Sequence, residues 1–126
     1  MNRESIRAVK PSTRENIFIR IQKAKELIDT WQTFEATVAQ IASKVHLSEY
    51  HFSRHFSQLV KQSPHQYIID RKMEYAIKEL EKDDKALQDI ALLCGYSCMA
   101  TFSRSFKQKY HMAPSDFRKC RFQERP

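Results

Sequence analysis

The sequence predicts an all-α protein of seven helices, arranged as two helix-turn-helix subdomains that are joined by a long central helix. Apolar residues recur at helical spacing along most of the chain. A pattern of short helix, tight turn and longer helix occurs twice. The 126 residues include one glycine and four prolines. So few turn-forming residues argue against the many hairpins of an all-β fold.

The N-terminal residues 1–14 are polar and basic, with Pro11 among them, and we expect them to form a flexible tail. The first subdomain is expected over residues 15–62. Its first helix begins at Glu15 and carries a single apolar stripe. The stripe consists of Ile17, Phe18, Ile21, Ala24, Leu27, Ile28 and Trp31. A short loop at 33–36 separates this helix from the next.

Two cap signals start the next two helices. Thr37 and Gln40 fit a capping box, in which each side chain bonds to the other residue's backbone N–H. Ser48 is expected to cap the following helix. Between them, His46 and Leu47 form a turn. The expected inward residues are Val38, Ile41, Ala42 and Val45 on the first of these helices, and Phe52, Phe56, Leu59 and Val60 on the second.

The linking helix is expected over residues 63–82. Ser63 stands at the cap position, Pro64 at the first helical position and Gln66 two residues later, which together are typical of a helix start. The charged run 82–85 ends the helix. Its expected apolar stripe consists of Ile69, Met73, Ala76, Ile77 and Leu80.

The second subdomain is expected over residues 83–120. A short helix ends near Gly95, and Ser97 is expected to cap the longer helix that follows. Pro114 opens a last short helix that holds Phe117, and residues 121–126 are expected to form a tail. The expected inward residues are Leu87, Ile90, Ala91 and Cys94, followed by Phe102, Phe106 and Tyr110.

The two subdomains share an internal repeat. Phe52, Ser53, Arg54, Phe56, Gln58 and Pro64 recur fifty positions later as Phe102, Ser103, Arg104, Phe106, Gln108 and Pro114. Ile41, Ala42 and Ser48 recur forty-nine positions later as Ile90, Ala91 and Ser97. We therefore expect one extra residue between the second cap and its first buried phenylalanine, and an unrepeated linking helix. His46 and Gly95 occupy the turns, where a residue that tolerates positive φ is needed.

Composition narrows the class of partner. Lys and Arg number 22 against 15 Asp and Glu, a net charge of +7. This surplus favours a polyanionic partner, although a basic protein without one has a similar composition. Three cysteines, an odd number, indicate reduced thiols and no disulfide framework. No apolar run suits a membrane span or a signal peptide, so we expect a cytoplasmic protein with no membrane partner.

The exposed face of the second helix in each helix-turn-helix offers groups that read DNA bases. Arginine bonds bidentately to guanine, serine hydroxyls adapt, and a tyrosine ring contacts a thymine methyl. The candidate base contacts are Tyr50, Ser53 and Arg54, then Met99, Ala100, Ser103 and Arg104. The candidate phosphate contacts are Ser48, Ser57, Lys61, Ser97 and Lys107. Because one chain holds two such faces that differ, a monomer can bind an asymmetric site.

One segment resembles the signature of a known family. The segment Ile90–Arg118 reads IALLCGYSCMATFSRSFKQKYHMAPSDFR, and it is similar to the signature of the AraC/XylS family of bacterial regulators. The stretch RKMEYAIKEL resembles the linking helix of that family, and the whole resemblance covers roughly residues 15–120. It implies a sequence-specific transcription regulator, by family habit an activator, that inserts two helices into successive major-groove segments of double-stranded DNA. RNA polymerase is a candidate second partner.

The resemblance leaves two points open. Many relatives carry polar side chains where Met99 and Ala100 stand, so base reading by the second subdomain is the weaker expectation. Most relatives also have a separate effector-binding domain. The chain therefore resembles either a small stand-alone member or a domain of a longer regulator.

Three alternatives remain beside this hypothesis. His51 and His55 lie four residues apart and could share a metal, but the glutamate of a zinc-protease motif is missing, so no enzyme, metal or cofactor is expected. Cys98 could serve as an exposed redox-active thiol. A sequence-neutral architectural protein would bind DNA by charge alone, with affinity that falls steeply with salt.

Overall fold

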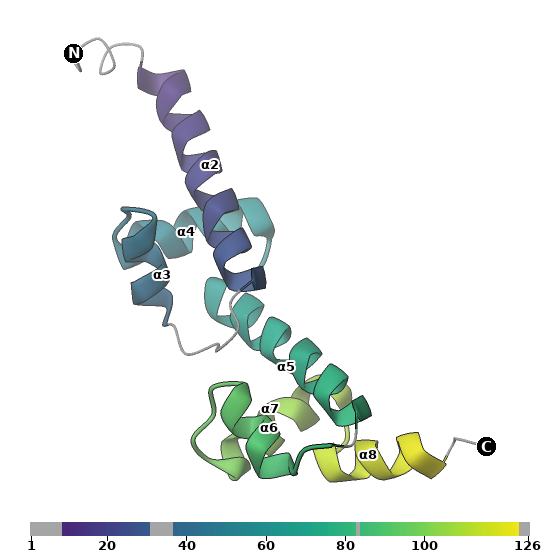
Figure 1. Cartoon of the computed structure of the whole chain (residues 1–126). Helices are drawn as coiled ribbons and strands as arrows, with labels where there is room; N and C mark the ends of the chain where they lie inside the picture. The colour runs from purple at the N-terminus through teal and green to yellow at the C-terminus, as the bar shows by residue number, and fades with distance from the viewer. Residues whose placement is uncertain (1–8, 31–36, 83, 124–126) are drawn as a thin grey trace. The chain divides into compact units, whose positions relative to one another are not determined.

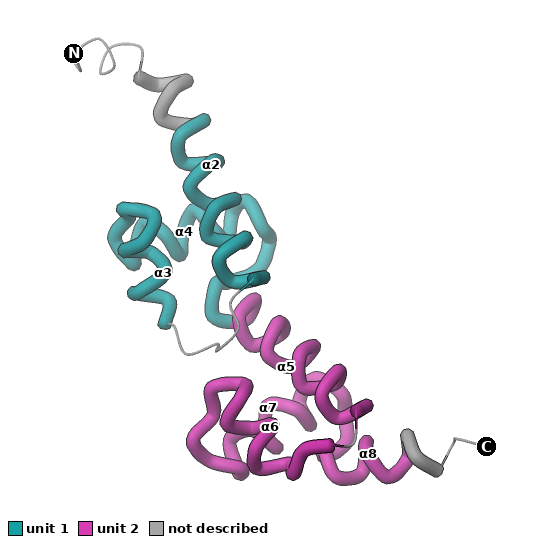
Figure 2. The backbone as a smooth tube through the Cα atoms, viewed as in Figure 1, with its two compact units in different colours: residues 1–31, 36–65 teal, residues 32–35, 66–126 magenta. Residues whose placement is uncertain are grey.

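The computed structural model describes residues 9–30, 37–82 and 84–123, with the side chains of 15–30, 37–82 and 84–120 (Figure 1). These residues form seven α-helices and no strand, which confirms the predicted all-α fold. They divide into two compact units between His65 and Gln66 (Figure 2). The predicted core residue Trp31 and the loop at 33–36 lie outside the described residues.

The first unit contains α2 (Val9–Thr30), α3 (Val38–Lys44) and α4 (Glu49–Val60). Helix α2 begins six residues before Glu15, so the predicted tail is wrong for residues 9–14. Pro11 is the third residue of this helix. The first four N–H groups of a helix have no intrahelical acceptor, so a proline there removes no bond.

The predicted core of the first unit is largely confirmed. Its buried apolar residues are Ile21, Ala24, Ile28, Ile41, Ala42, Val45, Phe52 and Phe56. Phe18 and Leu59 were expected inside, but their exposed fractions are 49% and 46%. Both residues line an open pocket between α2 and α4, which explains their exposure.

The local signals predicted for the first helix-turn-helix are confirmed. The backbone N–H of Thr37 donates to Gln40 Oε1 at 2.9 Å, and the N–H of Gln40 donates to Thr37 Oγ1 at 3.2 Å. The N–H of His51 donates to Ser48 Oγ at 3.2 Å. His46 takes a φ of 61° in the turn, as Gly95 takes a φ of 87° in the second turn. Each of these features needs only residues close in sequence.

The second unit contains most of α5 (Pro64–Lys82), then α6 (Leu87–Leu93), α7 (Met99–Tyr110) and α8 (Pro114–Gln123). Helix α8 extends three residues into the predicted C-terminal tail. Its Arg118 donates to the backbone carbonyls of Leu80 at 3.4 Å and Lys85 at 2.7 Å, and so ties α8 to the end of α5. The core consists of Met73, Ala76, Leu80, Ile90, Ala91, Cys94, Phe102 and Phe106.

Helix α5 was expected to be an unrepeated link, and this expectation is wrong. The fully buried Met73, Ala76 and Leu80 of α5 follow the same spacing as Ile21, Ala24 and Ile28 of α2, 52 positions earlier. Helices α2, α3 and α4 therefore correspond to α5, α6 and α7. Only the alanine is identical within this buried set, so residue identity alone did not reveal the match.

The extra residue of the second repeat lies before the cap and not after it. Helices α4 and α7 each have twelve residues and begin fifty positions apart, and their N-caps are Ser48 and Cys98. Equivalent residues of the two turns are instead 49 positions apart. Leu47 N–H donates to the Ala42 carbonyl in the first turn, and Tyr96 N–H donates to the Ala91 carbonyl in the second. Ser97 is thus the inserted residue, and the prediction that Ser97 caps α7 is wrong.

Within the described residues, no helix is both long and apolar enough to cross a membrane.

Candidate nucleic-acid interface

Helix α4 carries its predicted base contacts on the face opposite its buried phenylalanines. Phe52 and Phe56 are fully buried, whereas Arg54 is exposed and Tyr50 has an exposed fraction of 65%. Ser53 lies between these two extremes and is half-buried. Arg54 Nη1 donates to Tyr50 Oη at 3.1 Å, so the guanidinium lies along the helix one turn from the phenol. The structure therefore brings Tyr50 and Arg54 together on one surface.

Ser48, a predicted phosphate contact at the N-terminus of α4, is already hydrogen-bonded within the protein. Ser48 Oγ accepts the N–H of His51 and lies 2.7 Å from His51 Nδ1. The His51 ring also packs edge-on against Tyr50, with ring centroids 5.3 Å apart. Because His51 contacts both Ser48 and Tyr50, it belongs to this surface. The sequence indicates His51 only as a possible metal ligand.

The corresponding face of α7 is basic and less polar. Ala100, Arg104 and Lys107 are exposed, and Ser103 is half-buried. Met99 is half-buried and packs against the core of the second unit, so much of its apolar surface is already used within the protein. On this face Arg104 carries the planar guanidinium that can bond bidentately to guanine.

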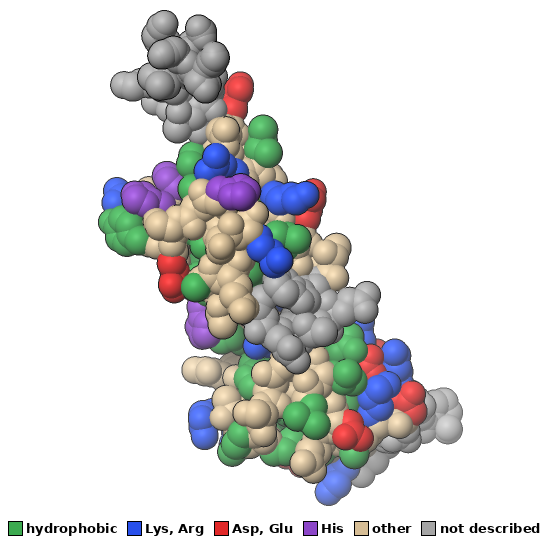
Figure 3. Space-filling view, turned by 60° about the vertical axis from the view of Figure 1, so that its left-hand side comes forward, with side chains coloured by type: hydrophobic (Ala, Val, Ile, Leu, Met, Phe, Trp, Pro, Cys, Tyr) green, Lys and Arg blue, Asp and Glu red, His purple; other side chains and the backbone are tan. Residues whose placement is uncertain are grey.

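The charges of α4 and α7 suit a polyanion. Helix α4 has one acidic residue, Glu49 in its first turn, and α7 has none. Ser57, Lys61 and Lys107 are exposed, as predicted phosphate contacts must be. Figure 3 shows histidine side chains together with Lys and Arg on one face of the first unit. Apart from Glu49, no carboxylate on these two helices opposes a phosphate backbone.

A basic residue from the preceding helix supports each turn. In the first unit, Arg20 Nη1 of α2 donates to the backbone carbonyl of His46 at 3.1 Å. In the second, Lys72 Nζ of α5 lies 4.8 Å from the centroid of the Tyr96 ring. Burial lowers the pKa of Lys72. The 52-residue offset that relates Arg20 to Lys72 follows from the match of α5 to α2 in the structure.

A family model described as a helix-turn-helix domain matches residues 41–120. The matched range contains both turns and both exposed arginines, and it covers more than half of the chain. The chain belongs to the AraC-type helix-turn-helix family.

Two curated relatives illustrate this membership. The regulatory protein SoxS of Salmonella typhimurium is 32% identical over 98 residues, which cover 78% of this chain and 92% of SoxS. The probable transcriptional regulator LumQ of Photobacterium leiognathi is 30% identical over 81 residues, which cover 64% of this chain. The match spans only 33% of the length of LumQ.

Solved structures show the same fold. The DNA-binding domain of AdpA, a global transcriptional factor solved in complex with a target DNA, matches with a TM-score of 0.72 at 22% identity. The match covers 87% of this chain and 96% of that domain. At this identity the likeness concerns the fold alone. These relatives are transcription regulators and not enzymes, in agreement with the sequence-based prediction.

In this AraC-type domain the two cysteines beside the second turn differ in chemistry. The thiol of Cys94 is buried, and burial raises its pKa to about 12. The thiol of Cys98 is exposed at the N-cap of α7. The backbone N–H groups of Thr101 and Ala100 stabilise its thiolate, with a smaller contribution from the Arg104 charge, and together they lower the pKa of Cys98. Cys98 is therefore the more reactive of these two thiols.

Metal binding at the histidine pair has no support from the described part of the chain. His51 and His55 find no third ligand there, since no group of three His, Cys, Asp or Glu side chains is placed to hold an ion. A tightly held metal needs at least three protein ligands, as zinc sites show. In the AraC-type domain His51 instead contacts Ser48 and Tyr50.

Proposed function

We propose that this chain is a sequence-specific transcription regulator that inserts α4 and α7 into adjacent major-groove segments of an asymmetric DNA site. One observation carries the proposal. Arg54 and Arg104 occupy equivalent positions of the repeat, and each is exposed on a helix whose opposite face buries two phenylalanines. A helix of this kind presents its polar face to base edges while its apolar face holds it on the domain.

Within this proposal, the two helices contribute unequally to base recognition. Helix α4 would contact bases through Tyr50, Ser53 and Arg54, where one phenol and one guanidinium are already hydrogen-bonded together. Helix α7 would rely on Arg104, with Ser103 as a secondary donor and Met99 and Ala100 as apolar contacts. The richer hydrogen-bonding face supports a more stringent sequence requirement for α4.

Phosphate contacts would set the register of each helix on the duplex. Ser57, Lys61 and Lys107 are exposed on or beside the two helices, and Ser97 is exposed between the second turn and α7. Ser48 would contribute through the N-terminus of α4, because its hydroxyl already bonds to His51. These contacts position the helices and carry no sequence information.

The two subdomains within one chain support binding as a monomer, because no second copy is needed to supply the second helix-turn-helix. Activation through contact with RNA polymerase, in the cytoplasm, completes the proposal. Its test is transcription by purified polymerase from a promoter that contains the DNA sequence obtained in the selection described below. Unchanged or reduced transcript would argue against activation and leave the DNA-binding role to its own test.

Selection from random duplexes at about 0.15 M salt tests the DNA-binding role. We expect one enriched motif with two unlike blocks. The spacing between the blocks should equal about one helical turn of DNA. If no sequence is enriched, and affinity follows only the salt concentration, the chain is a sequence-neutral binder. A palindromic motif would show that two chains bind together.

A further inference from the structure

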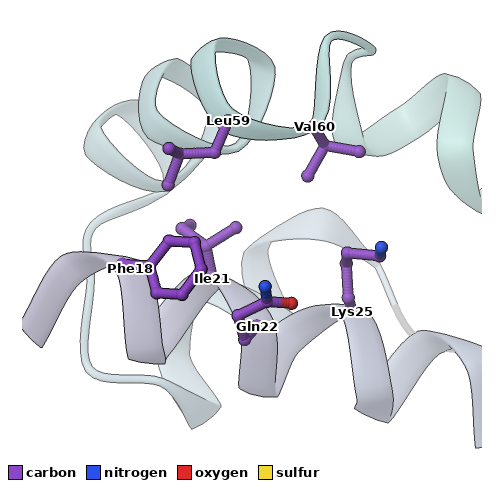
Figure 4. Close-up of a pocket in the computed structure, with 6 residues that line it drawn as sticks. All are labelled: Phe18, Ile21, Gln22, Lys25, Leu59 and Val60. Atoms are coloured by element: carbon purple, nitrogen blue, oxygen red, sulfur yellow. The ribbon is translucent and has the colours of Figure 1, made fainter. Parts of the chain in front are cut away.

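The first unit contains an open pocket of about 180 Å³ between α2 and α4. Four of the six residues that line it are apolar and two, Gln22 and Lys25, are polar, and Figure 4 shows these side chains on both helices. They are Phe18, Ile21, Gln22 and Lys25 from α2 and Leu59 and Val60 from α4. Nothing in the DNA-binding role described above uses this pocket.

The internal repeat shows what fills the corresponding space in the second unit. The offset of fifty between α4 and α7 matches Val60 to Tyr110. The Tyr110 ring lies 4.8 Å from the Phe106 ring, and it packs against the core that contains Met73. Met73 is the counterpart of the pocket residue Ile21. The second unit therefore carries the phenol ring of Tyr110 at the position where the first unit has Val60, and Val60 lines the open pocket.

Two residues whose charges act on Tyr110 stand at positions equivalent to two other residues of the pocket lining. Burial raises the pKa of Tyr110, and the charges of Glu74 and Asp70 raise it further, while the charge of Arg71 lowers it. Glu74 and Asp70 are the counterparts of Gln22 and Phe18.

In the second unit an ion pair joins the equivalent positions of α5 and α7. Lys109, the counterpart of Leu59, pairs with Asp70 at 3.5 Å. The corresponding Leu59 and Phe18 are both apolar and cannot form such a pair. They remain nearly half exposed at the rim of the pocket.

We propose that the pocket between α2 and α4 is a binding site for a small neutral aromatic molecule with one ring, of the size and polarity of phenol. Its volume exceeds the roughly 150 Å³ of an apolar cavity that holds benzene. Ile21, Leu59 and Val60 supply the apolar contact that Met73 and its neighbours give to Tyr110. The carboxamide of Gln22 can donate to or accept from a ring hydroxyl. Few atoms are involved, so the affinity lies in the millimolar range.

Phenol is the probe, and the full chain is titrated with it while NMR signals of the side-chain methyl groups are followed. We expect saturable shifts at Ile21, Leu59 and Val60, with the methyl groups of the second unit unaffected. The Val60→Tyr variant supplies the ring that the repeat carries at this position. It should lose most of the response to phenol and unfold at a higher temperature.

The second unit provides a matched control. Tyr110→Val should open the equivalent space, lower the unfolding temperature and create a new phenol response at the Met73 methyl group. Phenol should then recover part of the lost thermal stability, because a ligand that binds only the native state stabilises it.

Two results would overturn the proposal. One is the absence of saturable shifts at the pocket residues of the unmodified chain; the other is an unchanged phenol response in a folded Val60→Tyr variant. If that variant does not fold, Leu59→Lys takes its place, because Leu59 is exposed at the rim and its counterpart in the repeat is Lys109. An unchanged phenol response at Ile21 and Val60 in that variant would reject the site.

Discussion

Arg20 and Lys72 stand 52 positions apart at equivalent places in two three-helix repeats, and each supports the turn of its own helix-turn-helix. The chemistry differs: a guanidinium donates to the carbonyl of His46, whereas an ammonium lies over the ring of Tyr96. The turn that aims each second helix thus depends on a residue of the preceding helix as well as on its own backbone.

Replacing Arg20 should loosen the first turn. Arg20→Ala removes the bond to the His46 carbonyl, and we expect the free energy of unfolding to fall by about 1 kcal/mol. Hydrogen exchange at the N-terminal amides of α4 should accelerate as well. Urea unfolding and amide exchange check this expectation. Lys23→Ala changes an exposed residue of the same helix and should leave both quantities unchanged; an equal effect there would show that Arg20 acts only through the charge of α2.

Substitutions at the N-caps of α4 and α7 should change the stability of the chain in opposite directions. Ser48 accepts a capping bond from His51, whereas the Cys98 thiol makes no capping hydrogen bond, although the nearby amides of Thr101 and Ala100 favour its thiolate form. Ser48→Ala should destabilise the chain by about 1 kcal/mol, and Cys98→Ser should stabilise it by a similar or smaller amount. Thermal unfolding of both variants measures the effects. A loss of stability in Cys98→Ser would mean that the thiol contributes packing that the structure does not reveal.

The two thiols beside the second turn should react with iodoacetamide at different rates. The pKa of Cys98 is lowered by the amides of Thr101 and Ala100, so its thiolate is present below the ordinary value of 9.0. The pKa of Cys94 is raised to about 12, so it remains a thiol throughout the neutral and mildly alkaline range. Alkylation followed by mass spectrometry should modify Cys98 first, with a rate that rises with pH and is half-maximal below pH 9.0. Rapid alkylation of Cys94 in the folded chain would contradict this assignment.

Removing either arginine should affect a different part of the DNA site. Arg54→Ala should cost about 1–3 kcal/mol on the selected duplex and relax one block of the motif, and Arg104→Ala should relax the other. Repeating the selection with each variant measures these changes. If either variant loses affinity equally on all sequences, that arginine contacts phosphate.

Lys107 provides the matched phosphate-contact control for the arginines. Lys107→Ala should weaken binding to all sequences alike and reduce the salt slope by about 1, because one fewer phosphate is neutralised. Affinity measured over a salt series on the selected and on a scrambled duplex tests it. A loss confined to the selected duplex would place Lys107 among the base contacts.

The roles proposed for the exposed residues of α4 and α7 could be predicted from the repeat, since Ser53 and Arg54 recur with the buried phenylalanines around them. His51 could not, because its part depends on the positions of the Ser48 hydroxyl and the Tyr50 ring in the folded helix. Met99 was expected to face DNA, yet it packs partly against the core. A residue at the edge of an apolar stripe divides its surface in a way that spacing alone does not reveal.

The sequence by itself determined the helices, the Thr37 and Ser48 caps and the positive-φ turns at His46 and Gly95, because these features depend on groups within one or two turns of chain. Only the tertiary structure decided that α5 matches α2, that Ser97 lies outside α7, and that Phe18 and Leu59 remain exposed beside a pocket. Burial is decided by which distant side chains meet. Tyr110 packs against the core of the second unit whereas its counterpart Val60 lines an open pocket, and no local pattern records that difference.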